Sequence, residues 1–191
     1  TTPLQLCLMT AQLANGGFKI KPNIIYDSKF NYEEVLSKIQ SEKNKPIETN
    51  LLQDQNINLY EKLYKNSNNI KIVLDAMYGS TNEQFGTSFR SRHNDKKYRY
   101  AGKTGTSQVR RITEKDRELD LDTSEIEYKN RDHALFVAFA PYDKPKYAIS
   151  VLVEHGGSGS KAAAPLAKKL IKKIIDRDKD REIKREELKI S

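Results

Sequence analysis

Residues 101–109 read Ala-Gly-Lys-Thr-Gly-Thr-Ser-Gln-Val, and the organisation of the whole chain can be worked out from this stretch. Tyrosine and valine, which favour strands, lie at its two ends, so the sequence predicts a strand over residues 98–109. Glycine is uncommon inside strands, where it usually marks a bulge or a close approach by a ligand or another backbone. Gly102 and Gly105 therefore predict that something comes close to this strand.

Three polar side chains accompany the two glycines. Lys103 is a cation. Because side chains alternate between the two faces of a strand, the hydroxyls of Thr104 and Thr106 lie on the same face. In a regular strand the lysine points to the opposite face, so the local twist decides whether the three groups converge. A cation, two hydroxyls and an open backbone edge suit a site for an extended peptide that ends in a carboxylate.

Two other interpretations of the stretch compete with this one. A phosphate-binding loop that ends in Gly-Lys-Thr needs a glycine at position 97, where the chain has Lys97, so that interpretation fails. The second is a chance tetrapeptide in a lysine-rich chain, and only the rest of the sequence can decide against it.

The composition predicts a rather small hydrophobic core that is diluted by polar loops or tails. Of the 191 residues 37% are hydrophobic, and the mean hydropathy is −0.77. No apolar run has the length of a membrane span, and the N-terminus lacks the layout of a signal peptide. The net charge of +8 favours anionic partners, but 26 acidic residues are interspersed with 34 basic ones. The basic segment 168–189 is therefore expected to be a solvated helix face or a frayed tail, and Cys7 a buried structural thiol.

The first segment is predicted to be a helix with a well-defined start. Thr2 can cap it, Pro3 suits the first helical position, and Gln5 completes a capping box. Because this helix is apolar nearly all round, it is expected to be buried. Residues 15–17, Asn-Gly-Gly, should end it, and residues 18–25 suggest a short edge strand.

A polar segment separates this helix from the next. Residues 27–58 are predicted to be loop with a marginal helix near residues 33–40. From Ile57 to Met77 apolar residues return at helical spacing, and Gly79 and Gly86 are expected to mark the end of that helix.

After the central strand the chain is predicted to complete a sheet and close with a helix. The segments are a charged connection 110–132, a strand 133–140, a turn 141–146, a partner strand 147–153, a flexible glycine link 156–160, and a helix 162–175 with Leu166, Leu170, Ile171 and Ile174 on its apolar face. Helices followed by a meander of strands and a last helix indicate an α+β fold.

Several pieces of the chain, in this order, resemble the C-terminal part of the transpeptidase domain of class B penicillin-binding proteins, more narrowly the elongation-type penicillin-binding protein 2 group. The pieces are Thr2-Pro3-Leu4-Gln5-Leu6, Leu13-Ala14-Asn15-Gly16-Gly17, Met77-Tyr78-Gly79, Gly86-Thr87, Lys103-Thr104-Gly105-Thr106 with Ser107-Gln108-Val109 after it, Arg131-Asp132-His133, Phe139-Ala140-Pro141-Tyr142 and Val153-Glu154-His155-Gly156-Gly157.

The resemblance implies the C-terminal half of a β-lactamase-like transpeptidase domain, with antiparallel strands flanked by helices. This part would occupy residues 1–175. It would comprise a mainly helical portion, 1–90, with the polar insertion 27–58, and a portion 98–175 with the sheet strands and the closing helix. Residues 176–191 would form a charged tail.

The resemblance also implies serine acyl transfer through the motifs Ser-x-x-Lys, Ser-x-Asn and Lys-Thr-Gly. Lys103 would supply positive potential, and Thr104 and Thr106 would bind the carboxylate region of the substrate, with Ser107 beside them. Gly105 would leave room for a peptide to add as a further strand. The N–H of Thr106 would form half of an oxyanion hole, a donor worth roughly 3 kcal/mol in the transition state.

The family's nucleophilic serine and its second motif precede the helix that starts at Pro3, so no nucleophile is expected in this chain. Three tempting matches, residues 158–161 for Ser-x-x-Lys and residues 67–69 and 80–82 for Ser-x-Asn, are interpreted as structural or accidental. Ser158 in particular stands in a glycine link, a poor platform for a nucleophile. The site would therefore be half of an active site.

No metal site or cofactor is predicted. The histidines, at positions 93, 133 and 155, lack the spacing of metal ligands and are expected to be structural or exposed.

The favoured hypothesis is a fragment of a peptidoglycan D,D-transpeptidase, inactive alone and acylated by penicillins as part of its parent. The resemblance implies a site at the periplasmic face of the cytoplasmic membrane, anchored by an upstream segment. Expected partners are stem peptides, β-lactams, the upstream half of the protein, and a SEDS-type glycan polymerase with its elongation complex. A separated fragment is expected to self-associate through its exposed edge and apolar surface.

Two alternatives stay open. The chain could be a non-catalytic peptide-binding or scaffolding module that uses the same strand edge, and the presence or absence of an upstream Ser-x-x-Lys distinguishes the two. A basic nucleic-acid binder is the other alternative, although no nucleic-acid partner is expected, and it requires an affinity that falls with salt.

Overall fold

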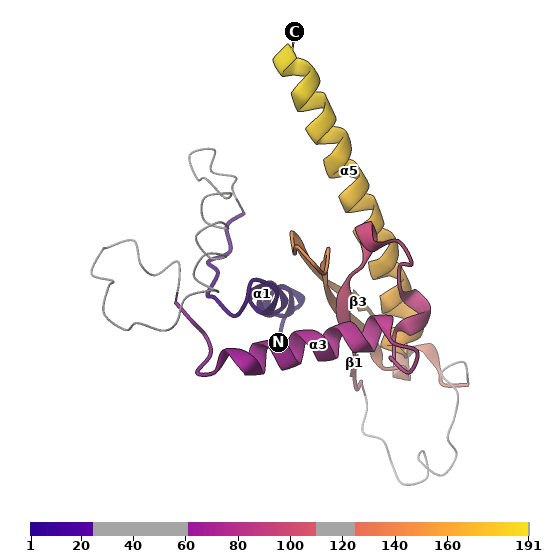
Figure 1. Ribbon diagram of the computed structural model, residues 1–191. Coiled ribbons are helices and arrows are strands. Elements are labelled where there is room, and N and C mark those ends of the chain that lie inside the picture. Colours follow the sequence, from indigo (N-terminus) through magenta and orange to yellow (C-terminus); the bar gives the residue numbers. More distant parts are fainter. Residues whose placement is uncertain (25–60, 110–124, 191) are drawn as a thin grey trace.

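The computed structural model describes residues 1–24, 61–109 and 125–190, with side chains as far as residue 180 (Figure 1). The described chain is an α+β arrangement, as predicted. A three-stranded antiparallel sheet has α1 and α3 on one side and α5 on the other. The predictions for residues 27–58, including the helix near 33–40, lie outside the described residues, as does most of the charged connection.

Helix α1, Pro3–Ala14, begins as the sequence predicts. The Thr2 hydroxyl accepts from the Gln5 amide at 3.2 Å, and the Gln5 side chain accepts from the Thr2 amide at 2.8 Å. The C-cap is Asn15, and the two glycines after it have positive φ.

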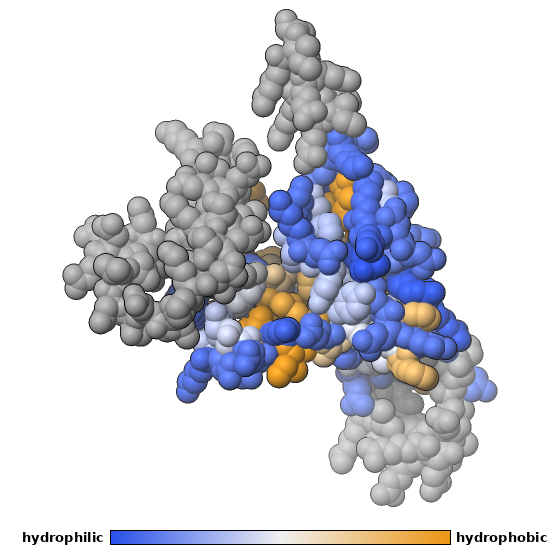
Figure 2. Space-filling view, in the orientation of Figure 1, coloured by the Kyte–Doolittle hydropathy of each residue, from blue (hydrophilic) through white to orange (hydrophobic). Residues whose placement is uncertain are grey.

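The predicted burial of α1 is wrong for most of its surface. Leu4 is 66% exposed and Met9 44%, while only Thr10 and Ala14 are buried. One face of α1 packs on β3 and β2, where the Cys7 thiol donates to Ala148 O at 3.3 Å and burial raises the pKa of that thiol. Elsewhere on α1 the described residues leave Leu4 and Met9 exposed. Figure 2 shows hydrophobic residues gathered around α1 and α3, whereas α5 is largely hydrophilic in the same view.

Helix α3, Ser67–Asn82, starts later than the apolar spacing predicts. Residues before it are extended: Lys62 forms an isolated bridge with Phe18, and this bridge is all that the described residues show of the predicted strand 18–25. Gly79 lies inside the helix and does not end it, because the helix continues to Asn82.

The sheet contains β1 (Ala101–Ser107), β2 (His133–Ala140) and β3 (Tyr147–Val153) in that spatial order. The central position of β2 and its hairpin with β3 confirm the prediction from their apolar sequences. The first strand is shorter than predicted, because Lys96–Tyr98 form a 3-10 turn before it. Two clusters of apolar side chains, one on each face of β2, make the core.

The predicted flexible link at residues 156–160 is an ordered part of the fold. The Gly157 amide donates to Asp132 O at 2.8 Å, and a π-helical turn runs over Gly159–Ala163. A Cβ on Gly159 would lie 2.5 Å from Leu135 O and 2.7 Å from Gly105 O, so glycine serves close packing here and not flexibility.

Helix α5, Ala164–Ile190, closes the structure and extends well past residue 175. Its buried face is formed by Ala164, Ala167, Ile171 and Ile175. The prediction that placed Leu166 and Leu170 on the core side is wrong: they are 43% and 46% exposed. Small alanines let the helix approach the sheet, which periodicity of large apolar residues does not reveal. None of the described helices is both long enough and apolar enough to cross a membrane.

Candidate functional site

The free edge of β1 is held by α3 over its first residues. The Gly102 amide donates to the hydroxyl of Thr81 at 3.0 Å, and that hydroxyl also lies 3.4 Å from Gly102 O. The side-chain amide of Asn82 donates to Tyr100 O at 2.9 Å. Thr81 is fully buried, so the last turn of α3 satisfies the edge of the sheet as far as Gly102.

Beyond Gly102 the edge is open in the part of the chain that the structure describes, where β1 pairs with β2 alone. In an antiparallel ladder the N–H and C=O of one residue point to the same side, and the side alternates along the strand. Both groups of Gly102 point toward α3, away from β2. The same groups of Thr104 and Thr106 therefore also point away from β2. No described strand pairs with them, and the Thr104 carbonyl accepts only from the Lys103 side chain, so an added strand could bond to this edge.

The structure brings Lys103 and Thr104 together at this edge. The strand keeps a one-to-one register with β2, and in this register Lys103 is opposite Val137, on the face away from the threonines. Its ammonium nevertheless reaches around the edge, where it donates to Thr104 O at 3.0 Å and lies 3.5 Å from the Thr104 hydroxyl. Thr106 and Ser107 follow as exposed residues of the same strand.

The two glycines of the strand serve different purposes, and neither makes a bulge. A Cβ on Gly102 would lie 2.5 Å from the Phe136 ring and 2.7 Å from Val137 O, so this glycine is required by core packing. A Cβ on Gly105 would meet only Leu135, at 3.4 Å. Of the two positions, Gly105 is the one where a side chain has room and where glycine leaves space beside the strand.

A group of hydroxyls next to the motif was not foreseen as part of the site. The Thr87 hydroxyl lies 3.4 Å from the Thr104 hydroxyl and 3.1 Å from the Ser80 hydroxyl. Ser80 begins one of the Ser-x-Asn matches, and the next two residues hold the β1 backbone, so that match is structural. The signal was present in Gly86-Thr87, which the sequence singled out only as a piece of the resemblance.

The other Ser-x-x-Lys and Ser-x-Asn matches lie away from this edge or are used in local structure. The Ser158 hydroxyl lies 2.9 Å from that of Ser160, and Ser158 O accepts from the amides at the start of the π-helical turn. Ser67 opens α3 as an exposed residue.

The three histidines have structural partners. His93 Nε2 lies 3.0 Å from Lys168 O, and burial lowers the pKa of His93. The ring Nδ1 of His133 accepts from the His155 amide at 3.0 Å, and His155 Nδ1 lies 3.0 Å from Arg131 O. Within residues 1–24, 61–109 and 125–180 no group of three or more His, Cys, Asp or Glu side chains could hold a metal ion.

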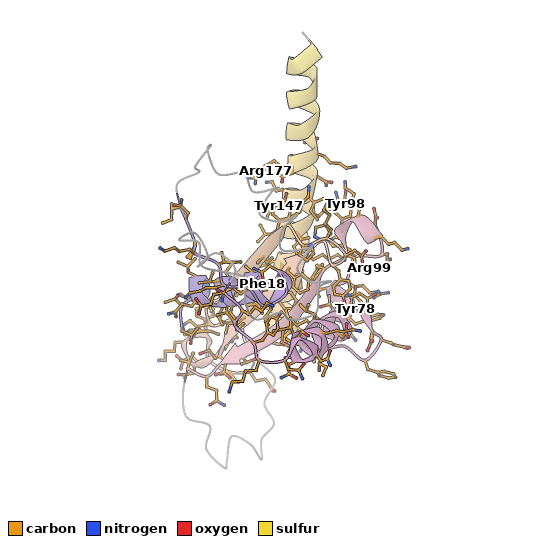
Figure 3. The ribbon with its side chains drawn as sticks, turned by 60° about the vertical axis from the view of Figure 1, so that its left-hand side comes forward. Phe18, Tyr78, Tyr98, Arg99, Tyr147 and Arg177 are labelled. Carbon is orange, nitrogen blue, oxygen red and sulfur yellow. The ribbon has the colours of Figure 1, made fainter. Side chains whose placement is uncertain are left out.

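A charged cluster fixes the segment that leads into β1. The Asp176 carboxylate on α5 accepts from Lys97 at 2.9 Å, from Lys172 at 2.6 Å and from the Tyr98 hydroxyl, and Tyr98 lies beside α5 (Figure 3). Hydrogen bonds from Lys172, Tyr98 and Lys97 hold the pKa of Asp176 well below its usual range. Asp176 was assigned to the tail, yet it anchors the chain just before the strand.

Comparison with known proteins identifies relatives for nearly the whole chain. Residues 1–172 match the penicillin binding protein transpeptidase domain. The peptidoglycan D,D-transpeptidase MrdA of Haemophilus influenzae is 33% identical over 175 residues, which cover 89% of this chain and 23% of that protein. MrdA of Acinetobacter baumannii is 32% identical, with 86% of this chain and 21% of that protein covered. The chain thus spans about a quarter of the length of these relatives.

Solved structures give the same result for the fold. A complex between penicillin-binding protein 2 and MreC from Helicobacter pylori aligns with a TM-score of 0.60 and 30% identity, covering 92% of this chain and 25% of that one. Pseudomonas aeruginosa penicillin-binding protein 2 in complex with WCK 5153 aligns with a TM-score of 0.58 and 29% identity, covering 90% and 30%.

Proposed function

This chain belongs to the penicillin-binding protein transpeptidase domain family, and we propose that it is the C-terminal part of the catalytic domain of an elongation-type peptidoglycan D,D-transpeptidase. The longer protein that would contain it is called the parent protein below. The observation that carries the proposal is the β1 edge, closed by α3 up to Gly102 and open from Thr104. Relatives named D,D-transpeptidase over 86–89% of the chain support it.

The open edge suits a stem peptide that ends in D-alanyl-D-alanine. The peptide would add to β1 as an antiparallel strand, with its backbone bonded to the outward groups of Thr104 and Thr106. Its terminal carboxylate would lie near the Lys103 ammonium and the hydroxyls of the two threonines. Gly105 leaves the space that such a strand needs, since a Cβ there has one near neighbour in the described chain.

In the reaction the carbonyl between the two D-alanines would accept a hydrogen bond from the Thr106 N–H. A serine from another part of the parent would attack that carbonyl carbon and form an ester. The amide bond to the last D-alanine would break, and its nitrogen would take the proton that the serine hydroxyl gives up. Charge that develops on the oxygen is stabilised by the amide, a contribution of roughly 3 kcal/mol. An amine of a second stem peptide would then displace the serine, and this step cross-links the wall.

The chain alone would be inactive under this proposal. Ser158, the serine that best fits the nucleophile motif, is bonded to Ser160 and caps a helical turn on the other side of the sheet backbone from Lys103. The apolar side chains exposed on α1 and α3, among them Leu4 and Ile72, support self-association of a separated fragment.

Location and partners follow from the same proposal. The parent would work at the periplasmic face of the cytoplasmic membrane and be held there by a segment outside this chain. The Helicobacter relative is seen in complex with MreC, which supports a partner of that kind here. A SEDS-type glycan polymerase and the other members of an elongation complex would be further partners, and β-lactams would bind as mimics of the stem peptide.

The test is the intact mass of two proteins after incubation with benzylpenicillin. The parent is expected to gain one penicillin per molecule at a serine outside the 191 residues, and the 191-residue chain is expected to gain none. Absence of an adduct on the parent would contradict the transpeptidase proposal and favour the binding-only module. An adduct on Ser158 would contradict the assignment of the nucleophile.

A further inference from the structure

Thr87 lies outside the Lys-Thr-Gly motif, yet its hydroxyl approaches the hydroxyl of Thr104. The distance between the two oxygens is 3.4 Å, and the Thr87 oxygen is 3.1 Å from the Ser80 oxygen. Three hydroxyls from α3, from the turn after it and from β1 therefore form a chain that ends at the open edge. The Lys103 ammonium lies 3.5 Å from the same Thr104 hydroxyl.

The position of Thr87 is built by its two neighbours. A Cβ on Gly86 would lie 2.4 Å from both Gly79 O and Ser80 O, so only glycine lets this turn pack so tightly on the end of α3. Ser88 is almost fully buried, and both its amide and its hydroxyl donate to Ser80 O, at 2.9 and 3.0 Å. Thr87 is thus held between two fixed residues while its own side chain faces the strand.

The hydrogen-bond chemistry gives the chain of hydroxyls a direction. A threonine hydroxyl has one hydrogen and two lone pairs. For Thr104 to donate that hydrogen to a carboxylate, its oxygen must accept from its protein neighbours. Lys103 can only donate, and Thr87 can donate to Thr104 while it accepts from Ser80. In that state each hydroxyl polarises the next, which strengthens the last hydrogen bond.

We propose that Thr87 is a positioning residue, which keeps the Thr104 hydroxyl hydrogen directed at the carboxylate of the bound peptide or β-lactam. The inference rests on the proposed function of the β1 edge. The separation of 3.4 Å is long for a hydrogen bond, and bonds of this kind tighten when the ligand is bound. Thr87 therefore acts on ligand binding through Thr104 without touching the reacting atoms.

The test compares Thr87→Val, which keeps the shape and removes the hydroxyl, with Thr87→Ser, which keeps the hydroxyl. Both are made in the parent protein, with Gln84→Ala in the exposed part of the same turn as a control. The measured quantities are the dissociation constant of the non-covalent complex with benzylpenicillin and the acylation rate at saturation. Thr87→Val is expected to weaken binding about fivefold, the value of one hydrogen bond, and to change the saturated rate less than twofold.

Two further results distinguish positioning from a general loss of structure. Thr87→Ser should bind like the unchanged protein, and the effect of Thr87→Val should fall below about twofold when the penicillin carboxylate is a methyl ester. A binding constant unaffected by Thr87→Val, or an equal loss with the ester, would overturn the inference. An equal loss in the saturated rate would also overturn it, because it would mean that the reacting groups had moved.

A structural readout separates failure of this inference from failure of the proposed function. If the unchanged parent forms no penicillin adduct, the proposed function fails, and the orientation of Thr104 can still be measured. The γ-methyl resonance of Thr104 in methyl NMR spectra should move in Thr87→Val and stay in place in Thr87→Ser. A Thr104 resonance that is unchanged in both variants would refute the positioning role in either case.

Discussion

The two halves of β1 differ in the hydrogen bonding of their outer edge. Up to Gly102 the edge is bonded to α3 (the held half), and from Thr104 it is open among the described residues (the open half). Near the start of the strand, Thr81 and Asn82 from α3 bond the backbone of Gly102 and Tyr100. From Thr104 onward no described strand or helix takes that place. Helix α3 therefore sets the point where the edge is no longer bonded within the described fold, and under the proposed function ligand binding begins at that point.

The two glycines of the strand give the sharpest contrast between the halves. Gly102→Ala places a Cβ 2.5 Å from the Phe136 ring and is expected to cost about 3 kcal/mol in the free energy of unfolding. Gly105→Ala meets Leu135 at 3.4 Å and is expected to cost less than about 1 kcal/mol, while it weakens penicillin binding. Thermal unfolding of the parent protein measures the loss of stability in both variants. Equal losses of stability in the two variants would break the comparison.

The charge of the open half is tested by Lys103→Met. Loss of a charged hydrogen-bond donor should lower the second-order rate of penicillin acylation about hundredfold, equal to roughly 2.7 kcal/mol. Stability should change little, because Lys103 is exposed. Lys144→Met, at an exposed position of the turn between β2 and β3, is the matched control and should acylate normally. If the acylation rate of Lys103→Met fell less than threefold, the Lys103 cation would not contribute to the reaction with penicillin.

The bonds of the held half are tested by Thr81→Val. This variant keeps the volume of a buried side chain but leaves the Gly102 amide without its acceptor, at a cost of about 2 kcal/mol in stability. Thr81→Ser keeps the hydroxyl and should recover most of that loss. Chemical denaturation measures both variants. If valine and serine were equally destabilising, the hydroxyl would not be what holds the edge.

The smallest effect is expected from Asp176→Asn, which weakens the cluster before β1. The pKa of Asp176 is lowered in the folded protein, so its charged form stabilises the fold above the ordinary value of 3.8 and this contribution is lost as the pH falls. The thermal midpoint of the variant should therefore lie below that of the unchanged protein at pH 7, and the gap should shrink below pH 4. Asp180→Asn on the same helix should show no such gap, and a gap that widened in acid would refute the role of the charge.

The elements fixed by local sequence were predicted well. The capping box of α1 depends on two residues that are three positions apart, and β2 and β3 are consecutive strands joined by a short turn. The predicted start of α3 is too early because Leu63, which shares its apolar spacing, is extended beside the Lys62–Phe18 bridge, where its amide donates to Gly17 O at 2.9 Å. The buried face of α5 was misplaced since alanines, chosen for close packing against the sheet, carry little periodic signal.

The candidate site was predictable only in part, because some of its contacts join residues that are far apart in the sequence. Residues of the motif are adjacent in the sequence, so Lys103 and Thr104 could be named from it. Thr81, Thr87 and Asp176 act on partners 21, 17 and 78 residues away, and no local pattern announces such contacts. The domain boundaries at residues 90, 98 and 175 stay predictions. So do the catalytic and binding roles of Lys103, Thr104, Gly105, Thr106 and Ser107.

Amide hydrogen exchange of β1 in the parent protein tests most directly the claim that the edge is divided between structure and binding. The Gly102 amide, bonded to buried Thr81, should exchange slowly with and without penicillin. The Thr106 amide should exchange quickly in the free protein and become protected once penicillin is bound. Protection of Thr106 that does not change on acylation would contradict the account, because it would mean that the ligand does not use the open half of the edge.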